Sequence, residues 1–65
     1  MFIPIHDIKT KMSYRINPHF LASYAERPGI QSGTTFVEIR LSGSPPFEIT
    51  IRDQDWKDFL TALQR

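Results

Sequence analysis

The sequence contains no cysteine, and this absence excludes disulfide bonds. A chain of 65 residues buries only about 60% of the surface that its unfolded form exposes, so its free energy of unfolding is small. Domains of this size often gain stability from a disulfide, a metal ion or a second subunit. Because disulfides are excluded, we expect oligomerisation to be the added stabiliser, and we expect a reducing compartment.

Excess charge and long apolar runs are also missing. The formal net charge is +1, which argues against strong electrostatic attraction to nucleic acid or to a membrane. No apolar run is long enough to cross a bilayer. The first residues, MFIPIHDIKTK, lack the basic start and apolar core of a signal peptide. We therefore expect one soluble, cytoplasmic domain over residues 1–65, with no membrane partner.

The residue patterns of common catalytic sites are absent. No serine lies in a glycine elbow, and no glycine-rich segment could cradle a phosphate. The two histidines, His6 and His19, lack the spacing of metal ligands. The acidic cluster of Asp53, Asp55 and Asp58 is explained by its place at the start of a helix, where carboxylates are favourable. We predict that the protein is not an enzyme and has no cofactor or metal site.

The second half of the chain has the alternation of a β-hairpin. Within residues 34–41 and 47–52, apolar side chains fall at every second position, as in half-buried strands. These apolar residues are Val37, Ile39, Leu41, Phe47, Ile49 and Ile51. The segment SGSPP between the two runs is a turn, because two consecutive prolines cannot lie inside a ladder.

The hairpin register follows from its apolar face. The predicted pairs are Leu41 with Phe47, Ile39 with Ile49, and Val37 with Ile51. This register also sets Arg40 opposite Glu48 on the solvent side, and such a pair contributes roughly 0.2–1 kcal/mol. A slip of one residue would turn every apolar side chain to solvent.

The C-terminal residues predict an amphipathic helix. Apolar residues at positions i, i+3, i+4 and i+7 form one stripe. They are Trp56, Phe59, Leu60 and Leu63. A carboxylate of Asp53 or Asp55 can cap the first turn. Because a helix this short is marginal alone, we expect it to pack on the sheet.

The first half of the chain predicts two further strands. The run MFIPI is a candidate short strand with Pro4 near an edge. In residues 8–16, IKTKMSYRI, alternation places Lys9, Lys11 and Arg15 on one basic strand face. With Tyr14 and Tyr24 as sources of stacking rings, this basic row is a candidate surface for single-stranded nucleic acid.

Residues 18–26 fit two structures. Asn17 followed by Pro18 is a good helix start, and Pro28 followed by Gly29 is a good helix stop. The same stretch also fits a turn at Asn17 and Pro18, followed by a strand over residues 21–26.

The chain resembles the FlbD-like small flagellar proteins and their uncharacterised relatives. The matching residues are 16–19 (INPH), 22–26 and 34–41, in an order of strand, turn, strand, loop, hairpin and helix. Pro45 and Pro46 depart from the pattern, because those proteins usually carry a glycine and a polar residue at this turn. The resemblance implies a strand over residues 21–26 and a non-enzymatic accessory or regulatory role.

We therefore predict an α+β fold: a small, bent antiparallel β-sheet of about four strands, closed on one side by the C-terminal helix. A second helix over residues 18–26 is the alternative. For function we predict a non-catalytic binding or regulatory module that contacts a protein partner, with a homodimer as one form. A nucleic-acid-binding module and a small inhibitor from a phage or mobile element are the alternatives.

The predicted contact surface is the solvent side of the strand over residues 34–41. Alternation places Phe36, Glu38 and Arg40 there. A large aromatic side chain on such a face marks either a contact surface or a position covered by the first half of the chain.

Overall fold

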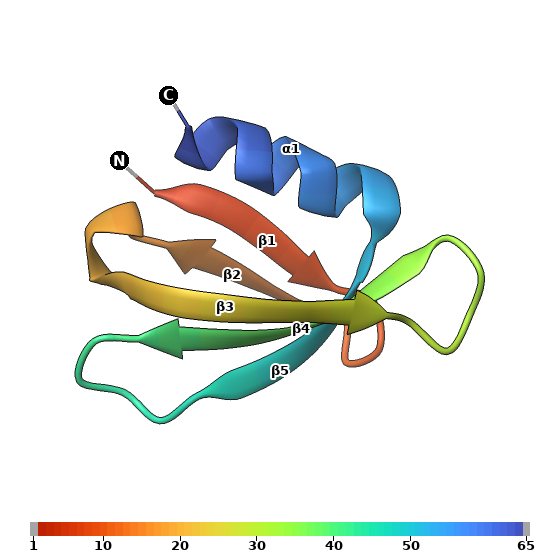
Figure 1. Ribbon diagram of the computed structural model, residues 1–65, viewed down its shortest axis with the longest axis horizontal. Coiled ribbons are helices and arrows are strands. Elements are labelled where there is room, and N and C mark those ends of the chain that lie inside the picture. Colours follow the sequence, from red (N-terminus) through yellow and green to blue (C-terminus); the bar gives the residue numbers. More distant parts are fainter. Residues whose placement is uncertain (1, 65) are drawn as a thin grey trace.

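The computed structural model describes residues 2–64, which form five strands and one α-helix (Figure 1). The elements are β1 (Ile3–Asp7), β2 (Met12–Ile16), the 3-10 helix η1 (Pro18–Phe20), β3 (Leu21–Pro28), β4 (Thr34–Leu41), β5 (Phe47–Arg52) and α1 (Asp53–Leu63). All strand pairs are antiparallel. The predicted α+β class is confirmed.

The strands form two sheets rather than one sheet of about four strands. One sheet is the β1–β2 hairpin and the other has the order β3-β4-β5. They meet where β1 ends, because the Ile8 N–H donates to the Thr50 carbonyl at 2.8 Å. The backbone of Pro4 faces the same edge of β1 as that of Ile8. Because proline has no N–H, Pro4 cannot donate a further hydrogen bond from β1 to the other sheet. The sheets therefore join at one end only.

The β1–β2 turn differs from the predicted strand over residues 8–16. The strand β2 begins only at Met12, and residues 8–11 form a turn. The Asp7 carboxylate accepts hydrogen bonds from the Lys9 N–H and the Thr10 hydroxyl, both at 3.0 Å. Lys11 has a positive φ of 63° and donates its N–H to the Asp7 carbonyl at 2.8 Å. Asp7 thus organises a turn that alternation alone does not reveal.

Residues 18–28 resolve the helix-or-strand ambiguity in favour of the strand. The Asn17 side chain accepts the His19 N–H at 3.0 Å and starts only the short helix η1. The Phe20 carbonyl then accepts the Ser42 N–H at 2.7 Å, which brings the chain alongside β4. The strand β3 follows, so the predicted strand is confirmed and the alternative helix is wrong.

The register between β4 and β5 is shifted by two residues from the prediction. The observed pairs are Thr34–Arg52, Thr35–Ile51, Phe36–Thr50, Val37–Ile49, Glu38–Glu48 and Ile39–Phe47. The predicted pairing of Arg40 with Glu48 is therefore wrong. A shift of two leaves each side chain on its predicted face, so the apolar pattern cannot distinguish the two registers.

The end of β4 explains the shift. Leu41 still lies opposite Leu21 on β3, but the pairing of β4 with β5 already ends at Ile39 and Phe47. The turn begins at Leu41, because the Ser44 N–H donates to the Leu41 carbonyl at 3.3 Å. Gly43 follows with a positive φ of 77°, a conformation that favours glycine. The hairpin loop is therefore longer than the predicted register allows.

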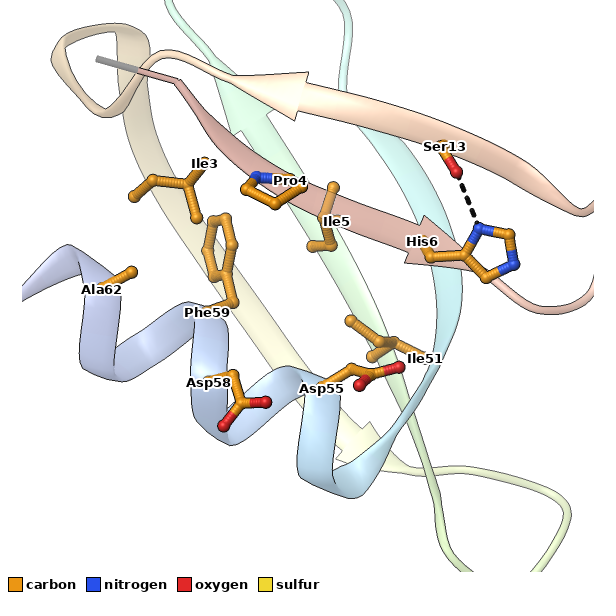
Figure 2. Close-up of a pocket in the computed structure, with 10 residues that line it drawn as sticks. All are labelled: Ile3, Pro4, Ile5, His6, Ser13, Ile51, Asp55, Asp58, Phe59 and Ala62. Atoms are coloured by element: carbon orange, nitrogen blue, oxygen red, sulfur yellow. Dashed lines mark hydrogen bonds between the residues drawn. The ribbon is translucent and has the colours of Figure 1, made fainter.

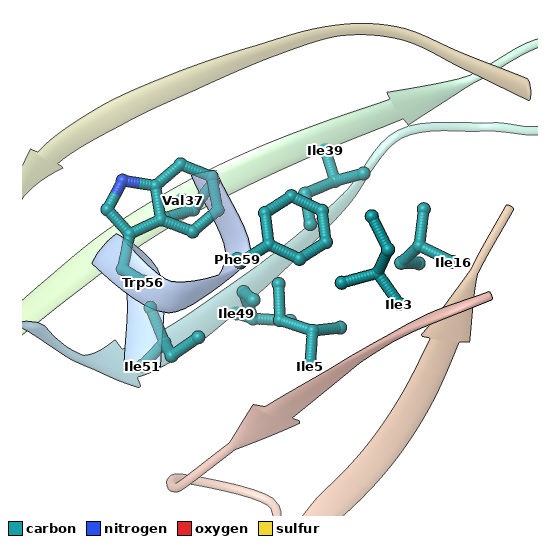
Figure 3. Packing of buried hydrophobic residues seen from close by; sticks show 9 residues of the cluster. All are labelled: Ile3, Ile5, Ile16, Val37, Ile39, Ile49, Ile51, Trp56 and Phe59. Carbon is teal, nitrogen blue, oxygen red and sulfur yellow. The ribbon is translucent and has the colours of Figure 1, made fainter. Parts of the chain in front are cut away.

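The core lies between the helix, the β1–β2 hairpin and the strands β4 and β5 (Figure 3). Its buried side chains are Ile3, Ile5, Ile16, Val37, Ile39, Ile49, Ile51, Trp56 and Phe59. The strand β3 contributes no buried residue, and it meets the cluster through the half-buried Leu21 and the exposed Tyr24. β3 is thus an edge strand outside the core.

The helix α1 packs through part of its predicted stripe. Trp56 and Phe59 are buried, whereas Leu60 and Leu63 are half-buried. The predicted carboxylate cap is wrong, because the N-cap is Arg52 and no side chain caps the helix. The Asp53 carboxylate instead accepts the Thr35 hydroxyl at 2.6 Å, which ties the helix start to β4.

Candidate functional site

The predicted contact residues lie on one face of the three-stranded sheet. Val37 and Ile39 point into the core. Side chains alternate along a strand, so Phe36, Glu38 and Arg40 point away from the core. We call this side of β3, β4 and β5 the outer face.

Phe36 is half-buried on the outer face. Arg27 of β3 lies directly opposite it, and the Arg27 guanidinium carbon is 4.8 Å from the centre of the Phe36 ring. This is cation–π geometry, which contributes about 0.5–1 kcal/mol at an exposed site. One neighbour from the first half of the chain therefore does cover part of Phe36.

The ring also belongs to a shallow depression at the end of β3. The depression is lined by Arg27, Pro28, Ile30 and Phe36, which we call the Phe36 patch. Ile30 is fully exposed, with a relative accessibility of 106%. An isoleucine in the loop after β3 thus presents its whole side chain to solvent beside an aromatic ring.

Charges of both signs surround the Phe36 patch on the outer face. The Glu38 carboxylate accepts from Arg40 Nε at 3.2 Å along the same strand. Glu48 of β5 lies directly opposite Glu38, so the two like charges are neighbours across the ladder. This part of the outer face can form hydrogen bonds and ion pairs but holds no reactive group.

The residues of the predicted nucleic-acid surface are not on one strand face. Lys9 and Lys11 lie in the β1–β2 turn, and only Arg15 and Tyr14 lie on β2. The Tyr14 ring is half-buried and packs against Phe47, with ring centres 5.2 Å apart. As successive residues of a strand, Tyr14 and Arg15 point to opposite faces. The prediction of a basic strand face is therefore wrong.

A groove runs between β1 and α1 (Figure 2). His6 and Ser13 lie opposite each other on β1 and β2, and His6 Nδ1 is 2.9 Å from the Ser13 hydroxyl. A catalytic pair needs a third group to orient the imidazole. Figure 2 shows Asp55 and Asp58 on the helix, across the groove from His6. The contact between His6 and Ser13 is an exposed hydrogen bond across the β1–β2 ladder.

The edge strand β3 is tied to α1 by contacts that sequence patterns do not reveal. Trp56 Nε1 donates to the Glu26 carboxylate. The Trp56 ring meets Tyr24 edge to face, with ring centres 5.3 Å apart, and stacks on Phe59 at 5.3 Å. The partners on β3 and α1 are about 30 residues apart in the chain, so no local spacing signals them.

Within residues 2–64, no three side chains of His, Asp or Glu gather as a metal-ligand set. The same residues include no helix that is long and apolar enough to span a bilayer. Comparisons with protein-family models, with curated proteins and with solved structures found no match to this chain. The resemblance to the FlbD-like proteins therefore stays a prediction.

Proposed function

We propose that the chain is a non-catalytic binding module that contacts a protein partner through its outer face. The Phe36 patch carries this proposal, because it joins a half-buried aromatic ring to a fully exposed isoleucine. Covering apolar surface is favourable by about 25 cal/mol per Å². Aromatic residues, phenylalanine included, and arginine are enriched at protein interfaces.

The arrangement of charge on the outer face supports the same proposal. Glu38, Arg40 and Glu48 lie farther along the sheet from Ile30 and supply a polar border to the apolar patch. Arg27 is already positioned over Phe36, so less side-chain freedom is lost when a partner covers both. A regulatory role, which the FlbD resemblance implies, requires such a protein-binding surface. The alternative role as an inhibitor requires one too, and the two roles differ only in which protein binds to it.

The test is site-specific photo-crosslinking of the full chain in its native cell. A photoreactive residue at position 38 probes the outer face, and the same residue at Lys57, on the exposed side of α1, is the control. We expect a protein adduct from position 38 and none from position 57. Because position 38 borders the Phe36 patch, the adduct also identifies the partner.

The purified partner then allows a quantitative comparison. Phe36→Glu places a charge in the patch and should weaken binding at least about tenfold, equivalent to about 1.4 kcal/mol. Phe20→Glu is the matched control, because Phe20 is a 56% exposed aromatic residue on η1, outside the patch. Circular dichroism checks that both variants fold. Equal affinity of the two folded variants would refute the proposal.

A further inference from the structure

The strand β3 has a free edge. Among residues 2–64 it pairs only with β4, and the sheet order β3-β4-β5 leaves its other side without a neighbouring strand. At eight residues it exceeds the usual strand length of about 5–6 residues. An exposed row of unpaired backbone N–H and C=O groups is a template for another strand.

The ladder between β3 and β4 shows which groups face outward. The Gly29 N–H donates to the Thr34 carbonyl at 3.0 Å, so this pair is hydrogen-bonded. Bonded and non-bonded pairs alternate along an antiparallel ladder. Counting back from Gly29, the backbone groups of Tyr24 and Glu26 therefore point away from β4. Pro28 also faces away from β4. A residue at this position donates no hydrogen bond to β4, so the missing N–H of proline does not weaken the ladder between β3 and β4.

The middle of this edge lacks the usual protection against strand pairing. Edges are commonly blunted by charged side chains, lysine above all, by proline, by a bulge or by a covering element. β3 has a bulge between Leu21 and Ser23 at its start and Pro28 at its end. Residues 23–27 between them, SYAER, contain neither lysine nor proline, and their two charged side chains already have partners, Glu26 in Trp56 and Arg27 in Phe36. The edge of β1 differs, because it carries Pro4 inside the strand.

We infer that β3 pairs antiparallel with β3 of a second copy of this chain, across a two-fold axis at Ala25. This register sets Tyr24 opposite Glu26 of the second copy, and the two residues exchange both N–H···O bonds. Symmetry repeats the pair on the other side of the axis. Ser23 lies opposite Arg27 of the second copy on the outer face. The two three-stranded sheets become one continuous sheet.

The side chains select this register over its neighbours. Ala25 meets its own copy in a non-bonded pair, where the Cα atoms approach to about 4.5 Å and a small side chain fits. An axis at Glu26 would set two carboxylates directly opposite each other, which is destabilising. An axis at Tyr24 would bring Glu26 against Ala22, where the bulge interrupts the ladder. Only the axis at Ala25 avoids both faults.

The same pairing covers an exposed aromatic ring. Tyr24 is 42% exposed although one side of it meets Trp56. The second β3 lies along its open side. A contact of one strand with one strand buries less than a standard interface of about 1,200–2,000 Å². We therefore expect a dimer with a dissociation constant on the order of micromolar rather than nanomolar.

Sedimentation equilibrium of the full chain tests self-pairing, from about 10 μM to about 1 mM. We expect wild type to dimerise over this range. Ala25→Lys sets two ammonium groups together at the axis and should raise the dissociation constant at least about tenfold. Gln31→Lys makes a lysine substitution in an exposed loop and should dimerise as wild type does. A wild type that stays monomeric throughout the range overturns the inference.

A charge-swapped pair tests the axis itself. Ala25→Glu alone should also dimerise more weakly than wild type, whereas an equimolar mixture with Ala25→Lys should dimerise more tightly than either variant alone, because only the mixed pair brings opposite charges together at the axis. A mixture that dimerises no more tightly than the single variants contradicts this register. Amide hydrogen exchange on wild type requires no substitution. The Tyr24 and Glu26 amides should exchange more slowly as concentration rises, and unchanged rates contradict the pairing.

Self-pairing uses the edge of the sheet, and partner binding through the outer face is a separate proposal. Phe36→Glu should dimerise as wild type does, because Phe36 lies on β4 and away from the axis. Loss of dimerisation in folded Phe36→Glu would show that the outer face, and not the β3 edge, joins the two copies.

Discussion

Asp7 joins the two sheets, and its substitution is the most direct test of the fold. Its carboxylate accepts the Lys9 N–H, the Thr10 hydroxyl, and the Thr50 N–H at 3.2 Å from the other sheet. The residue is 3% exposed, so water is a poor substitute for its carboxylate in these bonds. Asp7→Ala leaves two backbone donors without a partner, at a cost of roughly 1–3 kcal/mol each.

The expected loss of stability for Asp7→Ala is therefore about 2–6 kcal/mol. A domain of this length has a free energy of unfolding of roughly 3–10 kcal/mol, so this variant loses much of it. Asp7→Asn keeps a carbonyl oxygen for the two backbone donors, which share Oδ1, but loses the charge and the oxygen that accepts the Thr10 hydroxyl. We expect it to cost about 1 kcal/mol, which lowers the thermal midpoint by about 4–8 °C.

The pH dependence follows from the same contacts. Burial alone would raise the pKa of Asp7, but the hydrogen bonds from Thr50, Lys9 and Thr10 outweigh it and hold the pKa below its usual 3.8. Because the folded pKa is the lower one, the carboxylate stabilises the fold above pH 3.8. This contribution is lost as the pH falls through the folded pKa. Asp7→Asn should lack this part of the acid destabilisation.

Urea unfolding followed by the fluorescence of Trp56, the single tryptophan, measures both effects. The measurements run near neutral pH and at several values below about pH 4. Asp55→Asn, an exposed carboxylate in the first turn of α1, is the matched control. If Asp7→Asn and Asp55→Asn lose the same stability and keep the same acid response, then Asp7 does not join the sheets as argued.

Two further substitutions test the packing and the register. Glu48→Lys should raise the thermal midpoint by the equivalent of roughly 0.2–1 kcal/mol, because it faces Glu38; a lower midpoint would contradict the observed pairing. Phe59→Ala should cost about 3–5 kcal/mol by urea unfolding. Leu60→Ala should cost clearly less, since Leu60 is only half-buried, and equal losses would place both residues in the core.

The sequence predicts the elements better than their pairing. Alternation identifies β4 and β5, because one face of each is buried and the pattern records burial directly. The same pattern does not distinguish a shift of two residues, and the observed register goes with a turn that already begins at Leu41. The turn at Asp7 is not predicted from the sequence, for a related reason. Its carboxylate bonds to Thr50, 43 residues away, and no local pattern contains that contact.

The candidate site is likewise predictable from the sequence only in part. Alternation is enough to place Phe36 on the outer face, because the face to which a side chain points depends only on the two-residue period of its own strand. Its neighbours Arg27 and Ile30 come from β3 and the loop after it, so they are found only once the β3–β4 register is known. The free edge of β3 requires still more, since an edge is a property of the order of strands in a sheet.

The position of β3 separates stability from binding in this fold. β3 is as long as β4, yet it contributes no buried residue, so the hydrophobic core does not account for its length. It is held by its ladder to β4, by the bond from Trp56 to Glu26, and by Arg27 above Phe36. These contacts leave one edge and one face of β3 open. Substitutions there should change association more than unfolding, whereas substitutions in β1, β2 and the buried side of α1 should do the reverse.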